Sequence, residues 1–297
     1  MTPTTKTENS HKTVLRSPLG ILTTATATAT ATHGTRHDGD IPLPRLPGFV
    51  ESAFSPLAYE AARQCLAEQP GDGSRTAVAL ASTSGDTTTA DLASRRMVSG
   101  RVHNPLLFMQ ATPNSVLGYL SREFGITGQM FSLSTLDDPV TELLSMADLL
   151  LEDPEVDRVL VVGVELGGGE RLAAVHEELA DSRGHPALPA DAGLAAALLL
   201  GRPGTGTAVS VRSAEAYDNE NDSRNGMGAR GTDAARRPGD IQGLFDLAAA
   251  HRRLLREGGS RLLVTDSRAP AFLLTADTAD TETTTDARNG TETHAHQ

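Results

Sequence analysis

The feature that most constrains the fold is an alternation of helical and strand patterns between residues 104 and 166. Apolar side chains recur at helical spacing over 115–122, and a glycine-containing turn follows. An apolar, β-compatible segment comes next, at 130–136, and a second amphipathic helix leads to a nearly continuous apolar run at 158–164. Such a run is typical of a strand that is covered on both faces of its sheet. The pattern therefore predicts an α/β fold in which helices cover the strands.

The second of these helices has a clear start. Asp138 stands where its carboxylate can accept hydrogen bonds from the first backbone N–H groups, and Pro139 occupies the first helical position, where a missing N–H costs nothing. Asp153-Pro154 ends the helix. Its apolar side chains share one face, which should be buried: Val140, Leu143, Leu144, Ala147, Leu150 and Leu151.

Five short motifs follow one another through this region: NPLLF at 104–108, PNSVLG at 113–118, GITG at 125–128, SLST at 132–135 and DRVLVVGVE at 157–165. Their order and spacing resemble the N-terminal half of a β-ketoacyl synthase of the thiolase-like superfamily. Downstream, PADAG at 189–193 is similar to another segment of that family. The resemblance covers roughly residues 56–203 and implies a thiolase-like, layered α-β-α fold.

The resemblance also implies where a nucleophile would stand. In the family, a cysteine at the corner after the strand takes the acyl chain from a carrier protein. The matching residues here run from Ser134 to Asp138, so Leu136 falls at the cysteine's place, or Asp137 if the register shifts by one. Neither side chain can form a thioester, which requires a thiolate. We therefore expect no catalytic residue at this corner.

The same resemblance suggests residues for a substrate tunnel. In ketosynthases this region lines the acyl tunnel near the subunit interface, and in the catalytically silent chain-length-factor subunits bulky residues here limit the tunnel. The positions carried over by the resemblance are Phe108, Met109, Thr112, Met130 and Phe131. The alternative is that they are ordinary core residues, because packing and tunnel-lining residues have the same chemistry.

We divide the chain into a domain and two tails. The Thr/Ala-rich start, residues 1–41, offers no large apolar face and is predicted to be disordered. In the family the fold opens with a short strand that ends near a P-L-G, and Ser17–Gly20 stands at that place. The ketosynthase-like domain is predicted at 42–276 with a mobile insert at about 214–240, and the acidic segment 277–297 as a second disordered tail.

The second half of the predicted domain is short. A helix at 244–256 and strands at 261–265 and 271–276 are expected there. A full synthase carries two catalytic histidines and a lysine in this half, and the remaining residues are too few to contain it. The sequence around His251 matches neither histidine, so we interpret His251 as a structural residue on its helix.

Composition excludes several classes of function. The formal net charge of -12 disfavours nucleic acid and direct docking of an acidic carrier protein. The single cysteine, Cys65, lies on a predicted helix at 56–69; we interpret it as a core residue, and such low cysteine use fits a reducing cytoplasm. No apolar run approaches the ~18 residues needed to span a bilayer. No motif for a metal or a cofactor is present, so none is predicted.

Together these observations predict a chain-length-factor-like subunit of a type II polyketide or polyene system. It would form a heterodimer or heterotetramer with an active ketosynthase through the strand at 130–135. The acyl carrier protein would be only an indirect partner. One alternative is a stand-alone decarboxylase or acyl hydrolase that uses Asp137 or Asp138. The other is a paralogue with only a scaffolding role.

Overall fold

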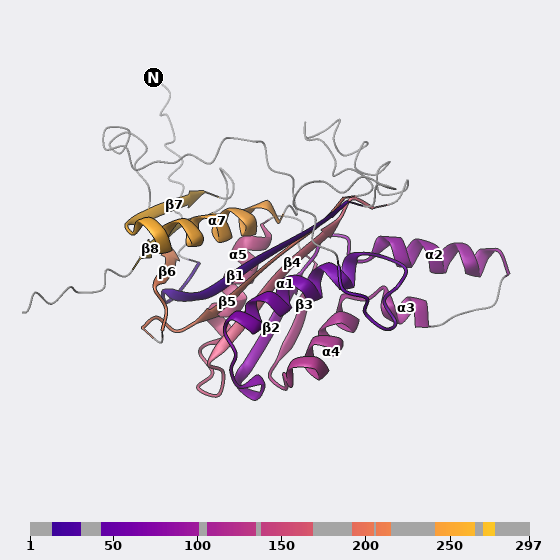
Figure 1. The fold of residues 1–297 in the computed structure, drawn as a ribbon, viewed down its shortest axis with the longest axis horizontal. Coiled ribbons are helices and arrows are strands. Elements are labelled where there is room, and N and C mark those ends of the chain that lie inside the picture. The colour runs from indigo at the N-terminus through magenta and orange to yellow at the C-terminus, as the bar shows by residue number, and fades with distance from the viewer. Residues whose placement is uncertain are drawn as a thin grey trace, which may run out of the picture.

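The computed structural model describes residues 14–30, 43–100, 106–134, 138–168, 192–204, 206–214, 241–264 and 270–276. Its elements in chain order (Figure 1) are β1 (Leu19–Thr30), α1 (Phe54–Glu68), a 3-10 turn (Gly73–Arg75), β2 (Thr76–Ala81), α2 (Thr87–Val98), α3 (Leu106–Gln110), α4 (Pro113–Phe124), β3 (Met130–Leu133), α5 (Pro139–Leu150), β4 (Arg158–Leu166), β5 (Ala192–Gly201), β6 (Val209–Ser213), α7 (Gln242–Glu257), β7 (Ser260–Val264) and β8 (Ala271–Ala276).

The strands form one mixed sheet in the order β3-β2-β4-β5-β1-β6-β8-β7. β2 runs parallel to both β3 and β4, and the other neighbouring pairs are antiparallel. Alternate side chains of the central strands enter two apolar clusters on opposite faces. One cluster contains α1 and α4, and the other contains α5 and α7. The expected layered α-β-α arrangement is therefore present.

The prediction of a disordered tail at 1–41 is wrong over residues 19–30, because these form the long strand β1. β1 lies between β5 and β6, and Ala25 and Ala27 are buried on the side of α1. The small alanines let the helix approach closely, as Gly193 in the neighbouring strand shows: a Cβ there would lie 2.5 Å from Leu57 of α1. A narrow apolar face is thus enough for a strand when the helix supplies the large side chains.

The start of β1 also corrects two boundaries. β1 begins at Leu19, so Ser17–Gly20 marks the start of the first strand and not its end. The domain accordingly begins well before residue 42, because Val14 and Leu15 already donate backbone hydrogen bonds to the Ser213 hydroxyl at 3.2 and 2.9 Å. Residues 1–13, 215–240 and 277–297, predicted as tail, insert and tail, lie outside the described residues.

The sheet contains one arrangement twice. In the first set, β5 pairs antiparallel with β1 on one side and with β4 on the other. In the second set, β8 pairs antiparallel with β6 on one side and with β7 on the other. A helix precedes one of these strands in both sets: α5 leads into β4 and α7 into β7. In the first set β2 and β3 continue the sheet beyond β4, whereas no described strand lies beyond β7. The predicted shortening of the second half is thus present in the described part of the chain.

Most other predicted elements are confirmed, with ends shifted by a few residues. α1 starts at Phe54 after Ala53, which has no capping side chain, and the Phe54 N–H donates to the Ser52 hydroxyl at 3.3 Å. None of the described helices combines the length and the apolarity needed to cross a bilayer.

Candidate functional site

The candidate site is the corner between β3 and α5, at the carboxyl ends of the parallel strands β2, β3 and β4. Two hydrogen bonds join these ends. The Ser134 hydroxyl donates to the Thr83 carbonyl at 3.2 Å, and the Thr83 N–H donates to the Glu165 carboxylate at 2.5 Å. Glu165 is only 7% exposed. Its role is to fix the loop after β2 against β4.

The corner residues themselves can be placed only in part. Leu136 and Asp137, the two candidates for the family's nucleophile position, lie outside the described residues. They are bracketed by Ser134, bonded to the β2 loop, and by Asp138, which opens α5.

Asp138 is the N-terminal cap of α5, as predicted. Its carboxylate accepts from the Val140 N–H at 3.1 Å, the Thr141 N–H at 3.4 Å and the Thr141 hydroxyl at 2.5 Å. These three hydrogen bonds hold the carboxylate against the first turn of its own helix. To act as a proton acceptor toward a substrate, Asp138 would have to give up the cap, which weakens the decarboxylase or hydrolase alternative.

Cys65 cannot replace the missing nucleophile. It lies on α1 with no exposed surface, and its Sγ is 3.5 Å from the Ala197 carbonyl oxygen of β5. Burial raises the pKa of the Cys65 thiol to about 12, with a smaller contribution from the charge of Glu68. A thiol with this pKa is protonated at neutral pH and unreactive. Cys65 is thus a core residue, as predicted.

His251 is the one histidine among the described residues, and it is buried too. Its ring contacts β1, with Nδ1 3.3 Å from the Thr24 hydroxyl, and the side chain is 3% exposed. Burial lowers the pKa of His251 from its ordinary value, and the charge of Glu68 opposes this only in part. The residue belongs to the packing of α7 on the sheet and has no path to the corner after β3.

The predicted tunnel residues are not core residues, with one exception. Phe108 is 45% exposed, Met109 63% and Phe131 39%. Thr112 is exposed as well, and its hydroxyl donates to the Met109 carbonyl at 2.8 Å, closing the turn between α3 and α4. Only Met130 packs against an apolar cluster. The core alternative is therefore wrong for Phe108, Met109, Thr112 and Phe131.

These five residues do not all face one space. β3 alternates, so Met130 packs on the cluster that contains α4, while Leu133 packs on the cluster that contains α5 and places Phe131 on that same side. On the same side as Met130, the Ser132 hydroxyl donates to the Asn114 side chain of α4 at 2.8 Å. Phe131 is thus separated from Met130 by the thickness of the strand.

Exposed apolar side chains lie on the edge strand β3, at Phe131, and on the helices α2 and α3: Met97, Val98, Leu106, Phe108 and Met109. α3 contacts both α2 and α4, and α4 contacts β3, so these elements are neighbours (Figure 1). We call this set the β3-side apolar surface. Its exposure could not be inferred from sequence, because helical and strand periodicity do not show which face lacks a neighbour.

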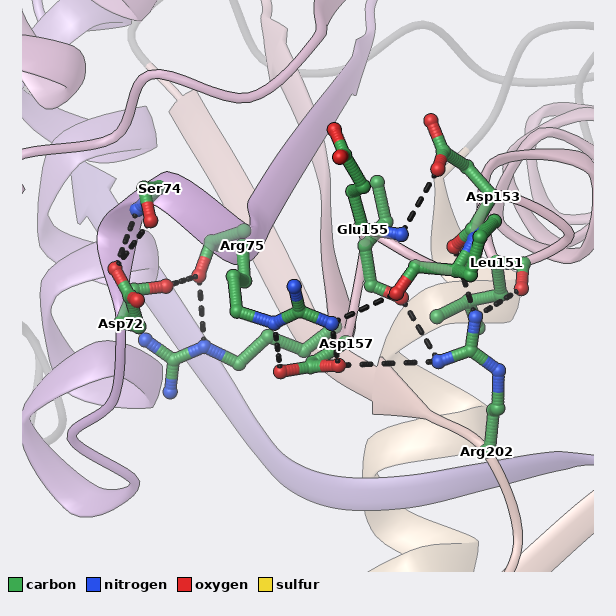
Figure 2. Close-up of polar contacts among 12 residues, drawn as sticks. Asp72, Ser74, Arg75, Leu151, Asp153, Glu155, Asp157 and Arg202 are labelled. Carbon is green, nitrogen blue, oxygen red and sulfur yellow. Dashed lines mark hydrogen bonds and ion pairs between the residues drawn. The ribbon is translucent and has the colours of Figure 1, made fainter.

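The opposite ends of the same strands carry a polar network of purely structural character (Figure 2). Arg75 binds both carboxylate oxygens of Asp157, at 2.5 and 2.7 Å, and also the Pro154 carbonyl at 2.7 Å. Arg202, just after β5, donates to the carbonyls of Leu151, Asp153 and Val156 at 2.6 to 2.9 Å. These bonds tie the start of β4 to the end of α5, and every group involved is already engaged.

The described residues contain no group of three or more potential metal ligands. The Thr83 backbone N–H is the one contributor to the corner that sequence reasoning missed. A backbone donor carries no signal in the residue type, so only the structure could reveal it.

Comparison with known proteins gives structural matches alone. No protein-family model matches the sequence, and no curated protein is detectably similar. A ketosynthase in complex with its chain length factor from Xenorhabdus doucetiae is 18% identical, with a TM-score of 0.53 over 86% of this chain and 98% of that one. The ketosynthase complex of a type II polyketide acyl-carrier protein is 14% identical, with a TM-score of 0.61 over 88% and 100%.

A third similar structure, the ishigamide ketosynthase/chain length factor, is 15% identical, with a TM-score of 0.54 over 87% of this chain and 98% of that one. At such identities the similarity establishes the fold. The chain has the thiolase-like α/β fold of ketosynthases, as its motifs predicted.

Proposed function

We propose that this chain is a non-catalytic ketosynthase-like subunit, of the chain-length-factor kind, in a type II polyketide or polyene system. The observation that carries the proposal is the β3 edge, which no described strand covers, beside the β3-side apolar surface. The fold supports it, and so does the sequence, whose single cysteine is buried in α1. An active ketosynthase would supply the nucleophilic cysteine and the histidines.

The β3 edge is suited to pairing with another strand. The carbonyls of Gln129 and Leu133 accept from the N–H groups of Val78 in β2 and of Ser82 just after it, with N···O distances of 2.9 and 3.1 Å. In a parallel pair, every second residue of a strand forms its backbone hydrogen bonds with the same neighbouring strand. The N–H and C=O groups of Met130 and Ser132 therefore point away from β2. An edge of this kind, next to exposed apolar side chains, favours association. Pairing there would cover Phe131.

The proposed role in the reaction is to shape the acyl chain's surroundings. The partner's cysteine would hold the growing chain and its histidines would carry out the condensation. This subunit would contribute apolar side chains near the interface, with Phe108 and Met109 on α3 closing the far end of the tunnel. The growing acyl chain would stop where these side chains block the tunnel, and this would set the length of the product.

Complex formation tests the proposal directly. The chain is expressed alone and together with a ketosynthase from the same organism, and light scattering after size exclusion gives the masses. We expect a 1:1 complex, or a multiple of it, with the wild-type chain. Phe131→Asp should abolish it, because a carboxylate would be buried without a partner.

Leu149→Asp is the matched control for this experiment. Leu149 is also an exposed apolar residue, at 51%, but it lies near the end of α5, away from the β3 edge. This variant should still form the complex. A well-behaved monomer or homodimer that ignores the ketosynthase, or equal loss of the complex in both variants, would refute the proposal.

A further inference from the structure

The far edge of the sheet, at β7, is also open among the described strands. β7 is the last strand in the sheet order and pairs with β8 on one side. The Ala276 N–H donates to the Gly259 carbonyl at 2.9 Å, which sets the antiparallel register. Bonded pairs then recur at Arg261 and Leu263, so the backbone groups of Ser260, Leu262 and Val264 point away from β8. These three residues present an unpaired row of donors and acceptors within the described structure.

The internal repeat shows what covers this position in the first half. β4 corresponds to β7, and its other side is covered by β2, which runs parallel to it with Thr76 opposite Arg158. Every residue of β2 is buried. By the same arrangement, a fully apolar strand parallel to β7 would complete the second half.

The segment that corresponds to β2 and β3 in the second half is much shorter than in the first. In the first half, β2 and β3 come from residues 31–138, between β1 and α5. In the second half, only residues 214–241 separate β6 from α7, and they contain no run of apolar residues. By its sequence, the segment at this place in the second half therefore offers no counterpart of β2.

The charges around the edge indicate the chemistry of its partner. Arg252, Arg253 and Arg256 are exposed on α7, which contacts β7, and Arg261 lies in β7 itself. The pKa of Glu257 lies below its usual value because Arg253 binds it and because Arg261 and Arg256 are close. This is a basic region on a chain whose formal net charge is -12. Exposed apolar groups, Leu255 and Val264, each 52% exposed, lie on the same two elements.

We propose that the β7 edge binds an extended segment of another protein, apolar at its centre and acidic at its ends, as an added strand parallel to β7. Main-chain hydrogen bonds to Leu262 and Val264 would hold the segment, and the arginines would select its acidic flanks. The edge is separate from β3, which lies at the other end of the sheet order. The inference does not depend on the proposed ketosynthase partner.

Two peptides serve as probes. Each contains TAVALA, the sequence of β2, with two glutamates at each end of one peptide and two lysines at each end of the other. Fluorescence anisotropy with the full chain gives the affinities, and hydrogen exchange locates the binding. We expect protection of the amides of Leu262 and Val264, and at least tenfold tighter binding of the glutamate peptide. The double substitution Arg256→Glu/Arg261→Glu should reverse this preference.

The backbone requirement is tested at Leu262. Leu262→Pro removes an outward N–H without taking a hydrogen bond from β8, so it should weaken binding at least tenfold, while Leu262→Ala should retain it. If the proline variant does not fold, peptides N-methylated at alternate residues replace it: one alternating set should abolish binding and the other should not. Protection at β3, binding that survives Leu262→Pro, equal effects of the two methylated sets, or a homodimer that uses β7 would overturn the proposal.

Discussion

His251 is a buried side chain whose ionisation is affected by the fold. It lies in α7 against β1, buried, with the Thr24 hydroxyl beside Nδ1 and a hydrogen bond to the Ile21 backbone. The ionised groups that affect it are Glu68 of α1, which favours the charged ring, and Arg252 on its own helix, which opposes it. Burial outweighs both, so the folded protein holds the neutral ring.

The pH dependence of stability follows from this. The pKa of His251 is lowered from 6.5, so the unfolded chain binds the proton more readily. The contribution to the free energy of unfolding is fully present above pH 6.5 and falls as the pH drops below it. Urea unfolding of wild type and His251→Gln between about pH 7.5 and pH 5 should show a shrinking difference. A difference that is constant with pH would contradict the buried, neutral ring.

Phe108 carries the prediction about product length. Its ring is 45% exposed in the isolated chain and would be covered only in a complex. Replacing it with Ala should lengthen the product of the reconstituted synthase by one or more extension units, because the tunnel gains room. Leu149→Ala, at an exposed position on α5 outside the β3-side apolar surface, is the control and should leave the product unchanged. If Phe108→Ala forms the complex but gives the wild-type product, only the scaffolding role remains.

Among the elements, β1 shows how little apolar surface a central strand requires. Its alanines face α1, while Thr24, Thr26 and Thr28 are half-buried on the other side. Every second residue thus has a different environment, although no side chain in the repeat exceeds Thr in size. The strand depends on close approach of α1 and on its pairing with β5.

Two substitutions at adjacent positions test this account. Ala27 is 1% exposed under α1, so Ala27→Leu should cost about 2 kcal/mol by overpacking. Thr26→Leu points to the half-buried face and should change stability by less than about 0.5 kcal/mol. Thermal unfolding of both variants provides the measurement. Equal effects, or none from either, would mean that residues 19–30 do not dock as described.

Sequence reasoning succeeded where the cause was local and failed where it was not. The Asp138 cap and the buried run in β4 follow from residue type and spacing alone. The prediction for β1 is wrong because small side chains predict no apolar face, whereas the strict alternation of Thr and Ala is itself a strand signal. The exposure of Phe108 and Phe131 depends on what the folded chain leaves uncovered, and no local pattern records that.

The whole molecule shares one of its two apolar clusters between the two halves of the sheet. Val140, Leu143 and Leu144 of α5 are in the same cluster as Leu247 of α7 and Phe272 of β8. The shortened second half thus has little core of its own. It is stabilised mainly by packing against the first.

Unfolding should accordingly be a single transition. Leu160 lies in the first half and Leu247 in the second, and neither is exposed. Replacing either with Ala should cost about 3 kcal/mol and lower the same transition in calorimetry. Two separate transitions, with each substitution affecting only one of them, would show that the halves are independent.

The repetition in β1 also has a consequence for folding kinetics. If the segment from Thr24 to Thr30 shifts by two residues along β5, every alanine returns to the same face of the sheet. The registers of β1 on β5 that differ by two residues therefore differ little in energy. Only the start of the strand distinguishes them, where Leu19 and Ile21 fill buried sites and a register irregularity separates Ile21 from Thr23. The search for the correct register therefore ends at these two side chains, and a chain that pairs its repeat first must slide or separate before it can complete the sheet.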